Sequence, residues 1–554
     1  MHPVVLLLIG VAIVLGGVLL FRLHAFLALI LAALTVASLT PLANREQYLG
    51  SKVALEPHKG YVVDGEAVRL AKNLPAGTPM VFLRREDDGW VESGTAAVTM
   101  VELDSGDMQS VLAGGAAFAD PAGMLMTSAQ WQQVRSDAGK GVGDRVGSAF
   151  GSTCGKIGIL IALAAIIGKC LLDSGAADRI VRAALHLVGE RGAPAAFVVS
   201  GFTLGIPVFF DTVFYLLIPL GKALRLRTGK NYLLYILTIV CGGTMAHSLV
   251  PPTPGPLLVA GELHVDIGLM ILGGILVGLC TSSAGFLYAN LMNRMLDVPL
   301  RETPESMKEL QEITGRDTSE LPPLWLSLLP ILLPVVLIAG YTVLDTLAKR
   351  TDAGASEWLT PTVMSWSAAL GNKNIALAIA AVISILTLVV VRRVSREQLA
   401  ESMQQALQSG GVIILITAAG GAFGAALQQT GIVEIIRRLP EGSPAVILTL
   451  AFLITAAVRT AQGSSTVAMI TAVGVLSGFA DPQTLGCHPL YLALAIGCGS
   501  KPVAWMNDSG FWVICKMSGM TEAEGLRFIT PLSILMGVTG LAVTLLAATF
   551  LPLT

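Results

Sequence analysis

One arginine and a run of hydroxyl and amide side chains lie together in an apolar stretch. Arg459 begins the segment RTAQGSSTVAM, in which Gln462, Ser464 and Thr466 follow it. An ionised group in a long apolar segment usually faces a partner, a cavity or a substrate. Because a guanidinium forks onto a carboxylate, and hydroxyls and amides hydrogen-bond a polyol, these residues predict a site for a polyhydroxy acid. The alternative is an arginine that bonds a backbone carbonyl or extends to a membrane interface.

Three other side chains are candidates for proton handling. Asp211 is the only acid in GFTLGIPVFFDTVFYLLIP (201–219). A carboxyl group removed from water there could bind and release a proton, or it could form a structural ion pair or hydrogen bond. Asp508 and His247 also lie in apolar surroundings. A lone histidine in such a place more often packs or hydrogen-bonds, so both interpretations of His247 stay open.

Two apolar segments are interrupted in ways that free backbone groups. The first contains three prolines in PPTPGP (251–256), and the second contains NDSG (507–510). Broken helices at membrane depth are tolerated where they line a cavity, and the N-termini of half-helices attract anions. We therefore expect substrate contacts from residues of both interruptions: Thr253, Gly255, Asn507 and Ser509.

The chain that positions these residues is strongly apolar. Of its 554 residues, 53% are hydrophobic and 13% are charged, with a mean hydropathy of +0.71, whereas soluble domains have roughly 25% charged residues. This composition excludes a water-soluble enzyme, and the net charge of −2 excludes a nucleic-acid-binding protein that relies on a basic face. The seven cysteines form no CxxC pair, and neither a metal nor a cofactor is expected. A multi-pass membrane protein remains.

Apolar stretches divide the chain into parts. Ten are long enough to cross about 30 Å of hydrocarbon, and two more, 194–220 and 445–475, are interrupted by Gly, Pro and polar residues. Residues 41–140 are rich in charge and contain short β-friendly runs, which predicts a small β-rich extramembrane domain rather than a disordered loop. We thus expect an all-α membrane protein with this insert: two helices over 1–40, the insert over 41–140, a first core repeat over 141–290, a cytoplasmic linker over 291–323 and a second repeat over 324–554.

The two repeats align with each other when the sequence is shifted by 256 residues. Gly175 then aligns with Gly431 and Arg182 with Arg438, and each copy is followed by an interrupted stretch and a broken span. Matched interruptions in two halves of a chain are typical of secondary transporters, whose substrate site lies between the repeats.

Charge in the short loops predicts the topology. If both interrupted stretches are re-entrant hairpins, the short loops on one side hold 17 Lys and Arg residues and those on the other side hold five. If both stretches cross the membrane, the same loops hold 11 on each side. The excess of positive charge on cytoplasmic loops therefore favours hairpins and inverted repeats, with both termini and the 41–140 insert in the periplasm.

Five motifs occur in chain order: FGSTCGKIGIL (150–160), GIPVFFD (205–211), HSLVPPTPGP (247–256), RTAQGSSTVAM (459–469) and NDSGFW (507–512). They resemble patterns of the gluconate permease family (GntP type), gluconate:proton symporters and relatives within the larger ion-transporter superfamily. The resemblance covers about 1–40 and 140–554. It implies proton-coupled uptake of gluconate or another small sugar acid across the bacterial inner membrane, by a homo-oligomer that we expect to be a dimer. The insert lies outside the family's usual plan, and Lys156 and Lys501 occupy positions where small or uncharged residues are expected.

In this interpretation Arg459 binds the carboxylate, polar side chains around it bind hydroxyls, and Asp211 and Asp508 carry protons. Lys501 or the helix N-terminus at 253–256 is the alternative carboxylate site. A different class of function is a membrane sensor whose insert binds a ligand. A membrane-embedded enzyme would need a nucleophile–base pair or a metal site, and the sequence contains no such motif.

Overall fold

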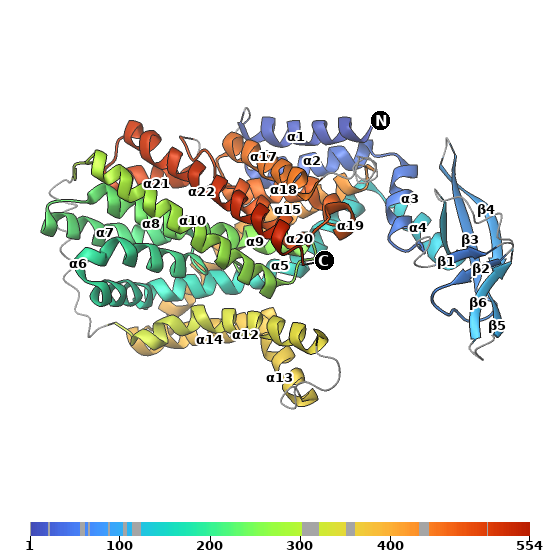
Figure 1. Cartoon of the computed structure of the whole chain (residues 1–554), viewed down its shortest axis with the longest axis horizontal. Coiled ribbons are helices and arrows are strands. Elements are labelled where there is room, and N and C mark those ends of the chain that lie inside the picture. Colours follow the sequence, from blue (N-terminus) through green and yellow to red (C-terminus); the bar gives the residue numbers. More distant parts are fainter. Residues whose placement is uncertain are drawn as a thin grey trace. The chain divides into compact units, whose positions relative to one another are not determined.

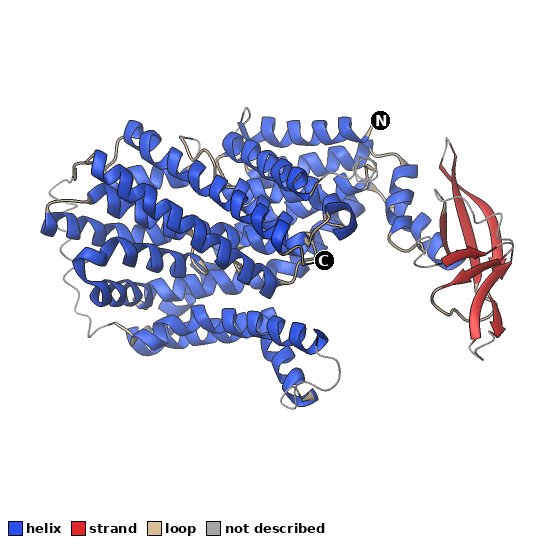
Figure 2. Ribbon diagram, viewed as in Figure 1, coloured by secondary structure: helices blue, strands red, loops and turns tan. Residues whose placement is uncertain are grey.

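The computed structural model describes residues 2–553 except 20, 22, 56–60, 65–66, 87–88, 103–107, 114–122, 302–320, 351–359, 432–442 and 507. Its contacts divide the chain into two units, which we describe separately (Figure 1). Unit 1 comprises 1–13, 30–149 and 422–438, and unit 2 comprises 14–29, 150–421 and 439–554. The strands of the described residues all belong to unit 1, and the rest of the fold is helical (Figure 2).

Unit 1 contains two antiparallel sheets within the segment where the sequence predicts a β-rich domain. One sheet has the strand order β1–β2–β6–β5, with bounds Tyr61–Asp64, Ala67–Leu70, Met108–Ala113 and Thr99–Glu102. The other has the order β4–β3–β7, with bounds Gly89–Ala97, Pro79–Glu86 and Met124–Thr127.

Strand β3 is buried on both faces. Because side chains alternate across a strand, Met80 and Phe82 pack into an apolar cluster with β1, β2 and β6. Val81 and Leu83 point the other way and pack with Trp131 of helix α4 (Ser128–Ala138). The core of this part of the unit therefore has two layers, one between the sheets and one under α4.

The helices at the beginning of the chain are short. They are α1 (Pro3–Leu19), α2 (Ala25–Leu39) and α3 (Leu42–Ser51). The chain bends by 102° between α2 and α3. Pro41, which lacks a backbone donor and is extended, precedes α3 at this bend.

Most of the remaining helices pack in unit 2, and α5 and α15 also extend into unit 1. The first series is α5 (Val142–Asp173), α6 (Ala176–Gly205), α7 (Phe210–Thr228), α8 (Tyr232–Leu249), α9 (Pro254–Glu262) and α10 (Ile267–Met295). The connecting series is α12 (Leu324–Arg350), α13 (Pro361–Gly371) and α14 (Lys373–Arg392). The last series is α15 (Arg396–Gln428), α17 (Pro444–Gln462), α18 (Ser465–Leu476), α19 (Pro482–Leu485), α20 (Pro489–Gly499), α21 (Ser509–Ser518) and α22 (Glu522–Phe550). Helices α6, α8, α10 and α22 lie side by side in Figure 1.

The first and last series follow the same order. A long helix (α5, α15) leads to a contacting helix pair with a short break (α6–α7, α17–α18), then to a second pair of helices separated by a break (α8–α9, α20–α21), then to a 29-residue helix (α10, α22). The aligned glycines also share a conformation, since φ is +80° at Gly175 and +85° at Gly431. Glycine adopts this left-handed region without steric strain. Local structure thus agrees with the sequence alignment of the two halves.

The expectation of ten full spans is too high for the described residues. Eight helices there are long and apolar enough to cross a membrane, or nine if α2 and α3 form one bent span. The stretch 488–514 is two helices of 11 and 10 residues, and α2 has only 15 residues. Each is shorter than the roughly 20 residues that a helical span needs.

Candidate functional site

The breaks of both series meet at one cavity inside unit 2. Its volume is about 290 Å³, at the lower end of the roughly 300–1,000 Å³ range of small-molecule sites. Residues from the break between α6 and α7 and from the break between α17 and α18 line it. So do residues beside the α8–α9 break and within the α20–α21 break. The structure therefore brings together the segments that the sequence singles out.

Four helices present their N-termini to this cavity. The lining includes Phe210 at the start of α7, Pro254 at the start of α9, Ser465 at the start of α18 and Ser509 at the start of α21. A helix N-terminus carries unpaired N–H groups and a partial positive charge of roughly half an elementary charge. Their convergence favours an anionic ligand.

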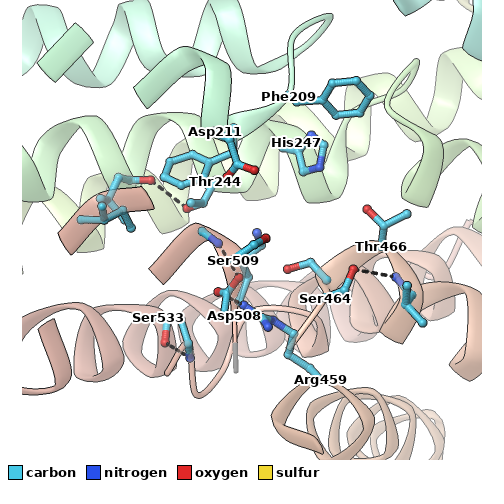
Figure 3. A pocket seen from close by; sticks show the side chains of 18 of the residues that line it. Phe209, Asp211, Thr244, His247, Arg459, Ser464, Thr466, Asp508, Ser509 and Ser533 are labelled. Carbon is cyan, nitrogen blue, oxygen red and sulfur yellow. Dashed lines mark hydrogen bonds and ion pairs between the residues drawn. The ribbon is translucent and has the colours of Figure 1, made fainter. Parts of the chain in front are cut away.

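Arg459 lies at the cavity, and protein groups occupy each of its three nitrogens. It is 3% exposed. Its Nε donates to the carbonyl oxygen of Ser500 at 3.1 Å, one Nη donates to the carbonyl of Gly463, and the other pairs with the carboxylate of Asp508. The guanidinium thus joins the end of α17 to the α20–α21 break (Figure 3). Two of its five N–H groups remain for other acceptors.

The two acids of the site have different surroundings. Asp508 pairs with Arg459, and its other carboxylate oxygen caps α21 by accepting a hydrogen bond from the Gly510 backbone N–H at 2.9 Å. Asp211 lies in the first turn of α7 and faces the cavity (Figure 3). Within the described residues, the Asp211 carboxyl has no hydrogen bond or ion pair. Asp211 is therefore the acid of this pair whose carboxyl group has no bonded partner in the described part of the chain.

His247 reaches the same cavity from α8. Its ring lies edge-on to that of Phe209, with 5.8 Å between centroids and an interplanar angle of 67°. Its Nδ1 is buried and has no hydrogen-bond partner among the residues that the structure describes. This arrangement combines packing, which the sequence favours, with a polar atom available to a ligand or water.

Hydroxyl groups line the side of the cavity formed by the second series. Ser464 caps α18, since its Oγ accepts from the Val467 backbone N–H at 3.3 Å, so its own hydrogen can still be donated. Thr466 and Ser509 are also in the lining. Arg459, Asp211, Asp508, His247 and these three residues are the predicted site residues that the structure brings together.

Three other predicted residues are close in sequence but lie outside the described lining of the cavity. Thr253 is 3% exposed and donates to the Val250 carbonyl at 2.7 Å. Gly255 packs so closely on the side chain of Met469 that an added Cβ would overlap it. Gln462 is buried, and its amide has no partner within the described part of the chain. A fourth, Asn507, lies outside the described residues.

The cavity also contains three residues, Thr244, Thr417 and Ser533, to which the sequence analysis gives no role. Lys501, the alternative carboxylate site predicted from the sequence, lines it too. Ser533 and Thr530 of α22 satisfy the backbone of Ala504 in the break: the Ala504 N–H donates to Ser533 Oγ at 3.0 Å, and Thr530 Oγ1 donates to the Ala504 carbonyl at 2.6 Å. Their i, i+3 spacing on an apolar helix puts both on one face, a signal that could have predicted them.

A cavity that contains charged and hydroxyl side chains and lies between broken helices of two similar series is typical of a membrane transporter. The match of residues 126–550 to the family model of GntP family permeases shows that the chain belongs to that family. The matched region begins after most of the 41–140 insert.

Two relatives carry permease names, and one solved structure is similar in fold. An uncharacterized permease of Haemophilus influenzae is 35% identical over 403 residues, covering 72% of this chain and 81% of the relative. The gluconate permease of Pseudomonas aeruginosa is 31% identical over 398 residues, covering 72% and 85%. The structure of Neisseria gonorrhoeae MtrF is similar in fold, with a TM-score of 0.56, 14% identity and 96% of each chain covered.

Proposed function

We propose that this protein takes up gluconate, or a closely related small sugar acid, together with a proton across the bacterial inner membrane. The observation that carries the proposal is the cavity itself: one unpaired carboxyl group, Asp211, faces a space lined by four helix N-termini and several hydroxyls. The name of the Pseudomonas aeruginosa relative, gluconate permease, supports the substrate class.

The proposed substrate contacts follow from the chemistry of the lining. The positive helix ends favour the carboxylate, while Ser464, Thr466 and Ser509 supply hydroxyls for a polyol chain. Gln462 and Asn507 are adjacent in sequence to these residues and stay candidates for the same role. The small volume, about 290 Å³, suits a six-carbon acid better than a larger conjugate.

Proton coupling is assigned to Asp211. The carboxyl group binds a proton from the outside, the substrate binds beside it, and both leave on the inside. Asp508 is a weaker candidate because Arg459 and the Gly510 N–H already stabilise its ionised form. His247, whose Nδ1 has no partner among the described residues, is the proposed second proton carrier.

The proposed topology has two re-entrant hairpins, inverted repeats, and both termini with the 41–140 insert in the periplasm, in a homodimer. The loop charges, 17 against five, support it, although α17 with 19 residues is long enough to cross by itself. A cysteine at the exposed insert residue Lys72, in a Cys280→Ser background, should react with an impermeant thiol reagent in intact cells. Labelling only after permeabilisation would reverse the topology.

Uptake into proteoliposomes tests the function. Purified protein should accumulate labelled gluconate when the outside is more acidic than the inside, and only equilibrate it at equal pH. Related acids that differ at single hydroxyls, used as competitors, define the substrate range. Absence of gluconate uptake under both conditions would overturn the proposal.

A further inference from the structure

Two cationic side chains line the cavity, and their bonding differs. Arg459 donates to three separate acceptors of the protein, among them the carboxylate of Asp508. Lys501 also lines the cavity and is 7% exposed. Among the described residues, its ammonium group has no hydrogen bond or ion pair. A buried cation without a partner is unfavourable, so Lys501 is the group whose charge still needs a counter-ion.

The backbone holds Lys501 at this position. It follows α20 at the beginning of the break, where its N–H donates to the Cys498 carbonyl at 3.2 Å. The carbonyl oxygen of the preceding residue, Ser500, accepts a hydrogen bond from Arg459 Nε. Pro502 follows and fixes φ at its own position. The backbone at Lys501 is therefore fixed, while its ammonium group has no bond to any residue that the structure describes.

We propose that Lys501 binds the substrate carboxylate and that Arg459 is a positioning residue, which holds Asp508 and the α20–α21 break in place. This inference rests on the proposed transport of a sugar acid and names the group that recognises its charge. It differs from the assignment that the sequence favours, in which Arg459 binds the carboxylate directly.

The charges around the cavity extend the inference to substrate class. Arg459 and Asp508 neutralise each other, which leaves Lys501 and Asp211 as the unpaired ionised groups of the described lining, with His247 as the other titratable side chain. When Asp211 binds a proton, the cavity is left with one net positive charge, on Lys501. One substrate carboxylate bound to Lys501 makes the net charge of the cavity zero again. A monocarboxylate with hydroxyls therefore fits, whereas a second carboxylate would be buried without a partner and would be rejected.

Binding of matched charged and neutral ligands tests the proposal. Gluconate and sorbitol differ at one end, a carboxylate against a hydroxymethyl group. Wild-type protein should prefer gluconate by roughly thirtyfold or more, because a charge-assisted contact is lost with sorbitol. Lys501→Met should abolish that preference, and Lys501→Arg should keep most of it. Glucarate, with two carboxylates, should compete more weakly than gluconate in the wild type.

The control is Lys156→Met, since Lys156 is exposed and lies outside the cavity; this variant should behave as wild type. Size-exclusion profiles and melting temperatures establish that each variant is folded. A folded Lys501→Met protein that keeps the wild-type preference for gluconate would overturn the assignment to Lys501. Wild-type protein that neither binds nor takes up gluconate would instead overturn the proposed function, and the assignment with it.

Discussion

The carboxylates of Asp211 and Asp508 approach the same point beside Gly510. A Cβ atom built on Gly510 would lie 3.6 Å from Asp211 Oδ1 and 3.3 Å from Asp508 Oδ1. The two acids come from different series, one in the first turn of α7 and the other at the N-cap of α21 (Figure 3). A side chain at position 510 would therefore stand close to both carboxylates.

Gly510→Ala tests this relationship. The methyl group would occupy the space between the acids, while alanine is favourable in the first turn of a helix. We expect a folded protein whose proton-driven uptake falls about a hundredfold, the lower limit of the 10²–10⁴-fold contribution of a positioned proton-transfer group. Uptake at the wild-type rate, measured in proteoliposomes under the same pH gradient, would show that this space takes no part in transport.

Asp211→Asn removes the unpaired acid and keeps its shape. We expect accumulation against a gradient to be lost, because the side chain no longer binds a proton, while exchange of labelled for unlabelled substrate at equal pH continues. Asp144→Asn, at an exposed acid in the first turn of α5, is the control and should leave both activities unchanged. Concentrative uptake by Asp211→Asn would remove this residue from the coupling mechanism.

Arg459→Met should act mainly on stability. It leaves Asp508 partly buried without its cation, and breaking a buried ion pair typically costs about 3–5 kcal/mol. Thermal unfolding in detergent should show a large fall in melting temperature, which Asp508→Asn in the same chain partly restores because no charge is then stranded. A normal melting temperature combined with lost gluconate affinity would instead place the guanidinium on the substrate.

Alanine substitution at a tightly packed glycine should also lower the stability of the protein. A Cβ on Gly274 of α10 would overlap the carbonyl of Leu249, the last residue of α8, whereas nothing lies within 4 Å of a Cβ on Gly340 of α12. Gly274→Ala should therefore lower the melting temperature and the yield of folded protein. Gly340→Ala should be neutral or slightly stabilising, by up to about 1 kcal/mol. Equal melting temperatures for the two variants would show that the α8 end has room to move.

The neutral charge balance at the cavity predicts electroneutral transport. One carboxylate anion and one proton carry no net charge, so the membrane potential does no work on the pair, whereas a single charge gains about 2.3 kcal/mol per 100 mV. A potassium diffusion potential set with valinomycin should leave the extent of gluconate accumulation nearly unchanged, and a pH gradient should increase it. Strong stimulation by the potential alone would indicate more than one proton per substrate.

Sequence patterns predict the membrane class and the segments that line the cavity, because these depend on local features. Apolar stretches, glycines such as Gly175 and Gly431, and proline-rich or Asn-Asp interruptions each carry their signal within a few residues. The roles of charged residues are less predictable. Arg459 carries the same signal whether it faces substrate or Asp508, 49 positions away, and only the folded chain decides between them.

The same limit applies to the choice between Arg459 and Lys501. The sequence names Lys501 only as the alternative carboxylate site, and the reason to prefer it, an ammonium group without a hydrogen bond or ion pair among the described residues, appears only in three dimensions. Thr253 and Gly255 belong to a conspicuous motif, yet the first bonds its own turn and the second packs against Met469. The expected ten spans exceed the eight or nine candidate spans of the described residues, because the length of an apolar stretch does not show where a helix breaks.

The most direct test of the account is proton movement caused by substrate. Proteoliposomes loaded with a pH-sensitive dye, at equal pH on both sides and with the potential clamped, should acidify inside when gluconate is added outside. Sorbitol should produce no signal, and Asp211→Asn protein should produce none with gluconate while still exchanging it. Gluconate entry without any internal acidification in the wild type would contradict proton coupling at this cavity.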